Sequence, residues 1–308
     1  MNESILITGA NIGLGKETAR QLALKKETKK VILLCRNQAK AEAAKKELEE
    51  QTGKKIFEII IGDVSDADSV RKAVEKIKEP IDAVILNAGG MVGKTAAKVT
   101  PSGMNELAAT NILGHVILVE ELIKHDKLKK AVLSISAEAV PGVKMLGMKP
   151  VSMRTSSVDE FAAILDGTYF GNKFDATQAY GYVKYVITMW TLSMARKYPE
   201  LKFVVMSPGN TRGTLAPDNL PPAMKFMVKN FMMPVVFPLL GGMVHKLEVG
   251  AKRFVDGISD ERYKSGFFYA SKEGKLSGDV VDQSTFFTDL KNTTFQDNAD
   301  VAIHRFIK

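Results

Sequence analysis

Short apolar runs alternate with longer segments of helical spacing through the first 135 residues. The runs are rich in β-branched side chains, which predicts strands at Ser4–Thr8, Lys30–Cys35, Ile56–Ile61, Ala83–Leu86 and Ala131–Ile135. Between them, apolar residues recur at helical spacing in Gly15–Lys26, and good helix formers dominate Ala39–Glu50. Apolar strands separated by helices are typical of a parallel sheet covered on both faces, so we expect a doubly wound α/β fold.

The same alternation continues towards the C-terminus, with a helix expected over Ala179–Arg196 and strands over Phe203–Met206 and Phe267–Ala270. Two segments interrupt it, residues 138–179 and residues 217–245. Neither is large enough for a domain of its own. We therefore predict one domain spanning residues 1–308, with an insertion at 138–179 and a substrate lid at 217–245.

A glycine-rich segment, GANIGLG, joins the first predicted strand to the first predicted helix. Gly9 permits a tight turn, Gly13 lets the backbone approach a pyrophosphate, and Gly15 lets the helix pack on the strand. The helix N-terminus offers free N–H groups to the anion. Three glycines can form an ordinary turn, but the flanking strand and helix favour a dinucleotide site that also includes Asn11 and Leu14.

The spacing TGxxxGxG resembles the short-chain dehydrogenase/reductase family, and other motifs of that family follow in its order. They are Asp63 and Val64 in IGDVSD, Asn87, Ala88 and Gly89 in NAG, Asn111 in TNILGH, Ser136 after the fifth strand, Tyr180 and Lys184 in YGYVK, and Ser207, Pro208 and Gly209 in SPG. The NxLGH form is most similar to the retinol dehydrogenase, protochlorophyllide reductase and carbonyl reductase branches. The resemblance implies a Rossmann-type fold, an adenine contact at Asp63, and hydride transfer between a nicotinamide cofactor and a carbonyl or alcohol.

Tyr180 and Lys184 are four residues apart on a predicted helix and share one face. Such a pair is common on surfaces, but the ordered motifs imply a catalytic role. A nearby ammonium and an oxidised nicotinamide would lower the tyrosine pKa from about 10, so that Tyr180 acts as general acid in reduction and general base in oxidation. The resemblance implies that Lys184 also binds the nicotinamide ribose and that Asn111 holds a water for proton relay.

Ser136 is the expected substrate-orienting serine, because it lies nearer the carboxyl edge of the sheet than Ser134, which faces the same side. Ser134 remains the alternative. Two departures from the family pattern stand out: Val183 replaces a common serine before the lysine, and 43 residues separate Ser136 from Tyr180. Carbonyl-reductase-like members carry a comparable insertion over a surface that others use to oligomerise, so both a monomer and a homodimer remain open.

The SPG motif continues as SPGNTRGT, where Pro208, Gly209 and Thr211 are expected to touch the nicotinamide end of the cofactor. Whether Thr214 takes the place of the usual family threonine stays open. At the other end of the cofactor, the second strand ends in LLCRN without the carboxylate that would bind a ribose 2′-hydroxyl. Arg36 offers a planar donor fork that suits a 2′-phosphate, so we predict NADP(H) rather than NAD(H).

The segment from Pro221 to Val244 is rich in Met, Phe, Val, Leu and Pro. A Met-rich surface adapts to varied apolar shapes, so a lid made of it favours a lipophilic or aromatic carbonyl substrate. The same segment could instead be plain core, a dimer contact or a patch resting on a membrane. The competing function is an NADP(H)-binding regulatory or redox-sensing protein without catalysis; such proteins usually lack the Tyr–Lys pair. A sugar-nucleotide epimerase would carry GxxGxxG and a longer substrate domain.

Composition narrows the possible partners and compartment. Hydrophobic residues make up 45% of the chain and the formal net charge is +8, but the lysines alternate with glutamates and lack interleaved aromatics, so nucleic-acid binding is not expected. No apolar stretch reaches the roughly 18 residues of a membrane helix, and the first residues lack signal-peptide features. The lone cysteine, Cys35, favours a cytoplasmic protein and is expected to be a small buried hydrophobe.

No metal site is predicted. The four histidines are dispersed and have neither partner cysteines nor paired carboxylates; they are His115, His125, His245 and His304. His115 is expected to be a packed polar residue on its helix.

Overall fold

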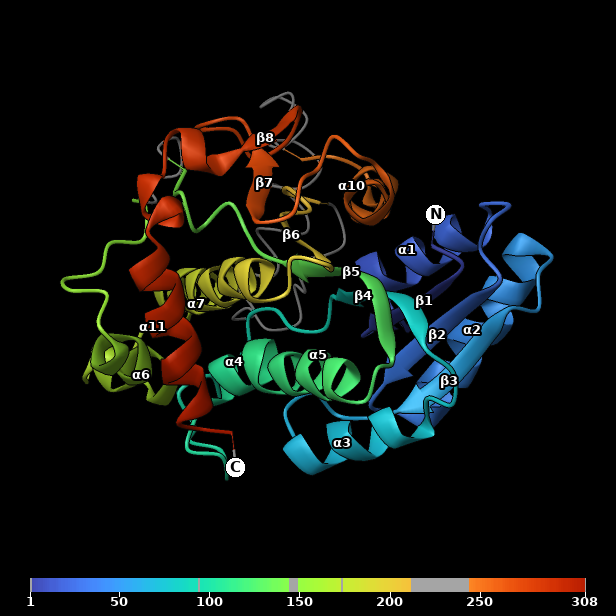
Figure 1. Cartoon of the computed structure of the whole chain (residues 1–308), viewed down its shortest axis with the longest axis horizontal. Coiled ribbons are helices and arrows are strands. Elements are labelled where there is room, and N and C mark those ends of the chain that lie inside the picture. Colours follow the sequence, from blue (N-terminus) through green and yellow to red (C-terminus); the bar gives the residue numbers. More distant parts are fainter. Residues whose placement is uncertain (1, 94, 144–148, 173, 212–243, 308) are drawn as a thin grey trace, which may run out of the picture.

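The computed structural model describes residues 2–93, 95–143, 149–172, 174–211 and 244–307 (Figure 1). Its strands are β1 (Ser4–Thr8), β2 (Lys30–Cys35), β3 (Phe57–Ile61), β4 (Ile81–Leu86), β5 (Leu128–Ile135), β6 (Lys202–Met206), β7 (Phe267–Ser271) and β8 (Val280–Asp282). Its α-helices are α1 (Gly13–Ala23), α2 (Gln38–Thr52), α3 (Ala67–Lys76), α4 (Glu106–Ala108), α5 (Gly114–Lys124), α6 (Val158–Asp166), α7 (Ala176–Lys197), α10 (Leu247–Ser259) and α11 (Thr293–His304). A π-helical turn, η1 (Ala109–Leu113), and the 3-10 turns η3 (Thr168–Phe170), η6 (Gln283–Thr285) and η7 (Thr288–Lys291) complete them.

The described strands form one sheet in the order β3-β2-β1-β4-β5-β6-β7-β8. All neighbouring pairs are parallel except β7 and β8, which are antiparallel. The chain winds outward in one direction from β1 to β3 and in the other from β4 to β7. The predicted doubly wound α/β fold is therefore confirmed. Ligands in such folds bind at the carboxyl edge where the order reverses, here between β1 and β4.

Alternating side chains of the central strands pack into two separate hydrophobic cores, one on each face of the sheet. On β1, Leu6 packs into one core, whereas Ile5 and Ile7 pack into the other. Helices α3, α4, α5, α6, α7 and α11 cover the first face, and α1, α2 and α10 cover the second (Figure 1). This is the period-two pattern of a sheet that is buried on both sides, which explains the near-continuous apolar runs in its sequence.

The later elements differ more from the sequence expectation. Helix α7 begins at Ala176, three residues earlier than expected, because the Asp175 side chain accepts a hydrogen bond from the Gln178 N–H and caps it. Strand β8 and helices α10 and α11 were not predicted. The described part of the 138–179 insertion contains α6 and η3, and both α6 and α11 pack against α7. The predicted lid at 217–245 lies outside the described residues except for its last two positions.

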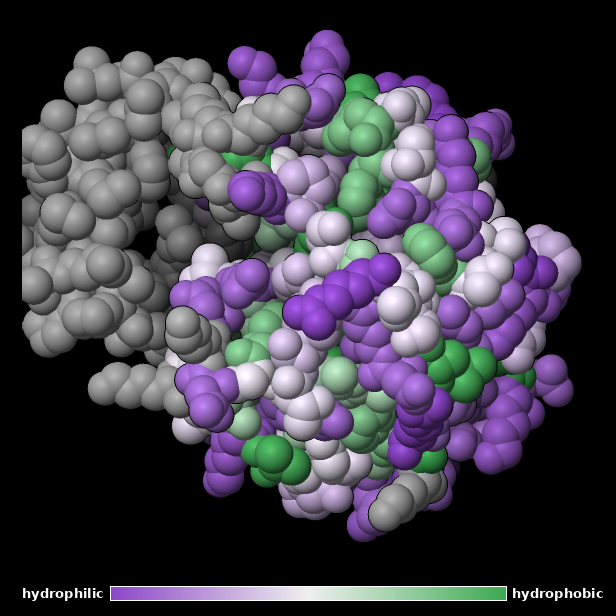
Figure 2. Space-filling view, turned by 90° about the vertical axis from the view of Figure 1, so that its left-hand side faces the viewer, coloured by the Kyte–Doolittle hydropathy of each residue, from purple (hydrophilic) through white to green (hydrophobic). Residues whose placement is uncertain are grey.

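Hydrophilic residues cover most of the described face in Figure 2, and the hydrophobic ones lie scattered among them. The exposed large apolar side chains come from different elements; they are Ile12, Leu24, Met91, Val99, Val249, Phe267 and Val301. Among the helices of the described ranges, none is both long and apolar enough to cross a bilayer.

Candidate active site

The glycine-rich turn between β1 and α1 has the backbone that its sequence predicts. Gly9 and Gly13 have φ angles of +67° and +57°, which favour glycine. A Cβ on Gly15 would lie 2.5 Å from the Gly9 carbonyl oxygen, whereas a Cβ on Gly13 would meet no described atom within 4 Å. No side chain caps the N-terminus of α1. Free helix N–H groups beside open space at Gly13 fit a pyrophosphate.

The NAG segment after β4 holds the end of β1 and the glycine-rich turn in place through hydrogen bonds. The Asn87 side-chain amide donates to the Thr8 carbonyl oxygen at 2.9 Å, and the Ala88 N–H donates to the Thr8 hydroxyl at 2.8 Å. Gly89 has a φ of +130°, and a Cβ there would lie 2.5 Å from Asn111 Oδ1. The motif thus joins the glycine turn to the helix that carries Asn111.

Arg36 and Asp63 follow the adjacent strands β2 and β3 at the same edge of the sheet. Arg36 is exposed and makes no hydrogen bond or ion pair with another described residue. The Asp63 carboxylate accepts hydrogen bonds from the Ser65 N–H and hydroxyl, at 2.9 and 2.7 Å. The Val64 carbonyl oxygen accepts from the Gly114 N–H at 2.9 Å. Cys35 is buried, as expected, and burial raises the pKa of its thiol to about 11.

Asn111 lies in the π-helical turn η1, a rare conformation that often marks functional positions. Its amide exchanges two 3.0 Å hydrogen bonds with the backbone of Gly90 and donates a third to Leu107 O at 2.8 Å. His115 is buried, as expected, and lies between Asn111 O and the Thr8 hydroxyl. Burial, reinforced by the Lys184 charge, lowers the pKa of His115 to about 3, so the ring is neutral.

Tyr180 and Lys184 lie on one face of α7, with Lys184 Nζ 5.6 Å from the centre of the Tyr180 ring. The ammonium donates to the carbonyl oxygen of Ile135, the last residue of β5, at 3.1 Å. Burial lowers the pKa of Lys184 to about 8, so it carries a charge at neutral pH. The pair therefore lies at the carboxyl edge of the sheet, as does the glycine-rich turn.

The expected depression of the Tyr180 pKa is wrong for the chain by itself. Burial raises the pKa of this phenol above its ordinary value, and the negative charge of Glu138 raises it further. Desolvation penalises the phenolate, and the sequence does not reveal that an acidic side chain lies close to it.

The two candidate serines are almost fully buried. Ser136 Oγ lies 2.8 Å from Thr188 Oγ1, one helical turn beyond Lys184 on α7. Ser134 Oγ has no hydrogen-bond partner among the described residues. No hydrogen bond joins either serine to Tyr180 within the described part of the chain. The substrate-orienting role of Ser136 thus remains a prediction.

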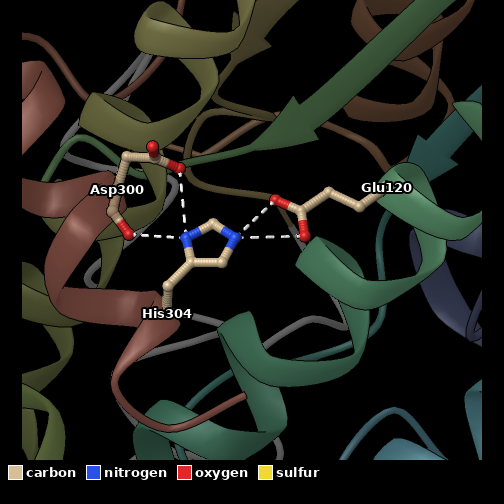
Figure 3. A group of neighbouring side chains, drawn as sticks. All are labelled: Glu120, Asp300 and His304. Atoms are coloured by element: carbon tan, nitrogen blue, oxygen red, sulfur yellow. Dashed lines mark hydrogen bonds and ion pairs between the residues drawn. The ribbon is translucent and has the colours of Figure 1, made fainter. Parts of the chain in front are cut away.

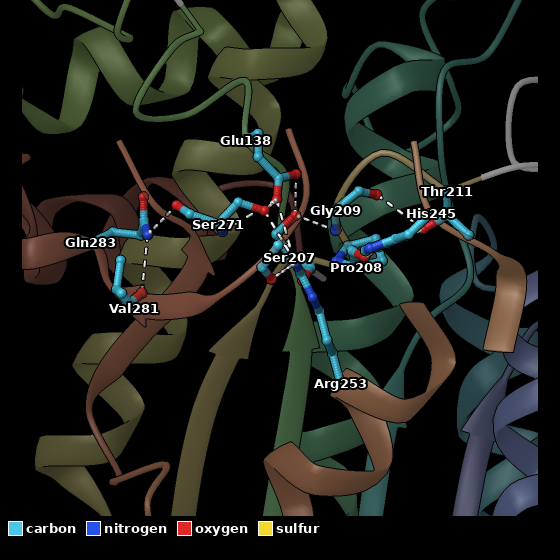
Figure 4. A network of polar contacts seen from close by, with 11 residues as sticks. Glu138, Ser207, Pro208, Gly209, Thr211, His245, Arg253, Ser271, Val281 and Gln283 are labelled. Carbon is cyan, nitrogen blue, oxygen red and sulfur yellow. Dashed lines mark hydrogen bonds and ion pairs between the residues drawn. The ribbon is translucent and has the colours of Figure 1, made fainter. Parts of the chain in front are cut away.

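A polar network surrounds the SPG turn and contains residues that the motifs did not indicate (Figure 4). The Glu138 carboxylate accepts hydrogen bonds from the hydroxyls of Ser207 and Ser271. Arg253 of α10 donates to Ser207 O at 3.2 Å and lies 3.6 Å from the same carboxylate. This network holds the turn at the ends of β6 and β7.

His245 secures the other side of the SPG turn. Its Nε2 lies 2.6 Å from Pro208 O and 3.0 Å from Thr211 Oγ1. Because the carbonyl oxygen can only accept, Nε2 carries the proton. Gly209 has a φ of +74°, and a Cβ there would lie 2.7 Å from the His245 ring. Pro208, Gly209 and Thr211 are thus brought together, whereas Thr214 lies outside the described residues. No sequence pattern pointed to Arg253 or His245, because both are distant from the motifs along the chain.

One histidine does have paired carboxylates, contrary to the sequence expectation. His304 of α11 lies between Glu120 of α5 and Asp300, with Nε2 3.0 Å from Glu120 Oε1 and Nδ1 3.5 Å from Asp300 Oδ1 (Figure 3). The hydrogen bond to Glu120 raises the pKa of His304 to about 9. The two carboxylates face opposite nitrogens of the ring, which suits a protonated imidazolium more than one shared metal ion.

Three comparisons with known proteins bear on the family and the fold of this chain. A family model described as short chain dehydrogenase matches residues 3–142. Dehydrogenase/reductase SDR family member 12 from Bos taurus is 32% identical over 213 residues, which are 67% of this chain and 60% of the relative. This chain thus spans less than two thirds of that relative.

Protochlorophyllide reductase, chloroplastic, from Daucus carota is 29% identical over 306 residues, covering 91% of this chain and 74% of the relative. An NADPH-bound carbonyl reductase from chicken fatty liver has a TM-score of 0.58 at 18% identity, covering 90% of this chain and 98% of that one. At this identity the structural likeness shows the fold alone.

Proposed function

The chain belongs to the short-chain dehydrogenase/reductase family of oxidoreductases, and we propose that it transfers a hydride between NADP(H) and a carbonyl or alcohol group. The observation that carries the proposal is the Tyr180–Lys184 pair on one face of α7, joined through Lys184 to the end of β5. The uncapped α1 and the open side of Gly13 lie at the same edge of the sheet and fit the cofactor's pyrophosphate.

In carbonyl reduction, the cofactor would supply the hydride to the carbonyl carbon. Tyr180 would donate its phenolic proton to the oxygen that becomes negative. Lys184, charged at neutral pH, would stabilise the phenolate that remains and hold the nicotinamide ribose. In the reverse direction, Tyr180 would accept the alcohol proton. Asn111 would hold the relay water, and Ser136 would orient the substrate oxygen.

The same proposal assigns the remaining cofactor contacts. Arg36 would bind the ribose 2′-phosphate, since it is exposed at the end of β2 without a described partner. The other contacts would come from the glycine turn, the strand ends and the SPG turn, namely Gly9, Asn11, Gly13, Leu14, Gly15, Asp63, Val64, Asn87, Ala88, Gly89, Pro208, Gly209 and Thr211. We expect Arg36→Ala to reduce the preference for NADPH over NADH at least tenfold, because a charge-assisted bidentate contact is lost. Comparing kcat/KM for both cofactors in both proteins measures this; unchanged selectivity would contradict the role of Arg36.

We also propose a lipophilic or aromatic substrate. The apolar composition of residues 221–244 supports this, and one similar relative is named protochlorophyllide reductase. A cytoplasmic location accords with the buried reduced Cys35. We leave a monomer and a homodimer as the two candidate states; α6 and α11 already pack against α7. A series of aldehydes, ketones and quinones graded by hydrophobicity tests the substrate class, which fails if polar compounds turn over best.

The central test replaces Tyr180 by phenylalanine. Tyr180→Phe keeps the ring but removes the proton donor, so turnover with NADPH should fall by roughly a hundredfold or more while NADPH binding persists. Stopped-flow or steady-state NADPH oxidation gives the first quantity and fluorescence titration the second. Tyr182→Phe on the same helix serves as the matched control, because the Tyr182 hydroxyl donates to Ser152 O instead. Near-normal turnover of Tyr180→Phe would refute the assignment.

A further inference from the structure

Glu138 is a buried acidic residue that none of the motifs explains. It follows β5 by three residues and is 8% exposed. Burying a carboxylate is costly unless it is paired and hydrogen-bonded, and Glu138 meets both conditions. One oxygen accepts from the Ser207 hydroxyl; the other accepts from the Ser271 hydroxyl at 3.1 Å and lies 3.6 Å from Arg253. These contacts fix the position of the carboxylate.

The loop after β5 that carries Glu138 also lies against the first turns of α7. A Cβ on Gly181 would meet the Ala139 carbonyl oxygen at 3.4 Å and the Ala139 side chain at 3.7 Å. Gly181 directly follows Tyr180, and Ala139 directly follows Glu138. The residue after Glu138 therefore packs beside the residue after Tyr180, while the Glu138 carboxylate itself binds the serine of the SPG turn (Figure 4).

We propose that Glu138 is a positioning residue for the proposed reaction: through its charge it keeps Tyr180 in the proton-donating form, and through its hydrogen bonds it anchors the SPG turn. The inference rests on the proposed function of Tyr180. The charges that bear on it come from three elements. Lys184 lies over the Tyr180 ring from the same helix. Glu138 acts on Tyr180 from the loop after β5. Arg253 of α10 pairs with Glu138, and His245 and Tyr263 lie close to Arg253.

The direction of the electrostatic effect follows from these charges. The negative charge of Glu138 raises the pKa of Tyr180 beyond what burial does. A nearby positive charge, such as the Lys184 ammonium, acts in the opposite direction. Glu138→Gln preserves the size and most hydrogen bonds of the side chain and removes the charge. We expect the Glu138→Gln variant to have a Tyr180 pKa that is lower than in wild type by about 1. This is the order expected for one charge acting across a partly buried site.

Two readouts test the inference. The first is the acid limb of alcohol oxidation with NADP+, where activity rises as Tyr180 loses its proton; its midpoint should move down by about one pH unit in Glu138→Gln. The second needs no turnover: in protein labelled with 13Cζ-tyrosine, the Tyr180 signal, assigned with Tyr180→Phe, should begin to titrate at a correspondingly lower pH. Glu138→Asp, which restores the charge, should return both readouts towards wild type.

Asp82→Asn is the matched control. Asp82 is also a buried carboxylate, paired with Lys130 at 2.9 Å, but it lies at the amino end of β4, on the opposite edge of the sheet. Its variant should leave both readouts unchanged. If Glu138→Gln does not fold, the double variant Glu138→Gln, Arg253→Met leaves no unpaired buried charge and carries the same measurements.

The outcomes separate the inference from the function it rests on. If Glu138→Gln turns over but the acid limb of its pH profile and its Tyr180 signal are both unshifted, the role of Glu138 alone is overturned. A purely structural residue would change stability or rate without moving the pH profile or the Tyr180 titration. A shifted Tyr180 signal in a protein that never turns over any alcohol or carbonyl overturns the proposed reaction while the coupling between Glu138 and Tyr180 stands.

Discussion

Gly13 and Gly53 form a natural pair of probes for the cofactor site. Both have a left-handed backbone, with φ of +57° and +68°, and an added Cβ would meet no described atom at either position. Gly53 ends α2, where its N–H donates to Glu49 O. Replacing either by alanine should thus cost the same backbone strain, about 1–2 kcal/mol. In a protein of this size, that lowers Tm by several degrees.

Only Gly13→Ala should weaken the binding of NADPH. The methyl group would occupy the open space in front of the uncapped α1 N-terminus, where the pyrophosphate is proposed to bind. Losing one or two charge-assisted hydrogen bonds there costs about 1.5–3 kcal/mol each, which weakens NADPH binding by at least tenfold. Gly53→Ala should bind NADPH as tightly as wild type.

Two measurements distinguish the effects of Gly13→Ala from those of Gly53→Ala. Urea unfolding without nucleotide gives the strain, and NADPH fluorescence titration gives Kd. Saturating NADPH should also raise the Tm of wild type and Gly53→Ala, but raise that of Gly13→Ala much less, because stabilisation depends on the ratio of ligand concentration to Kd. Equal NADPH affinities of the two variants would refute the placement of the pyrophosphate. A much larger loss of stability in Gly13→Ala would show that its surroundings are not open.

Two further predictions concern stability. His304 has a pKa raised from 6.5 to about 9, so its contribution is complete below about pH 6.5 and is lost as the pH rises through 9. The gap in unfolding free energy between wild type and His304→Gln should therefore shrink from about 1 kcal/mol at pH 6 towards zero at pH 9.5, the small size reflecting the half-exposed side chain; a pH-independent gap would contradict it. Gly114→Ala places a Cβ 2.3 Å from the Val64 carbonyl oxygen, so urea unfolding should reveal a loss of roughly 1–3 kcal/mol, and no loss would mean that this contact relaxes freely.

The sequence predicted what local patterns encode. Strand β1 and the glycine turn were placed correctly, because a short apolar, β-branched run and a glycine-rich turn are patterns of only a few residues. The family was also confirmed. Strand β8 has only three residues, Val280–Asp282, and is defined by its pairing with β7 rather than by any pattern of its own. The Glu138 and His304 contacts join residues 133 and 184 positions apart, so no local pattern could reveal them.

The hydrogen bonds around His115 show how the chain organises the site before any ligand binds. Asn111 O can only accept, so His115 Nδ1 carries the proton and Nε2 must accept from the Thr8 hydroxyl. That hydroxyl in turn accepts from the Ala88 N–H. A single directed chain of hydrogen bonds therefore runs from the NAG segment through β1 to the π-helical turn. Because burial and the Lys184 charge lower its pKa to about 3, His115 is neutral at neutral pH and adds no positive charge beside Lys184.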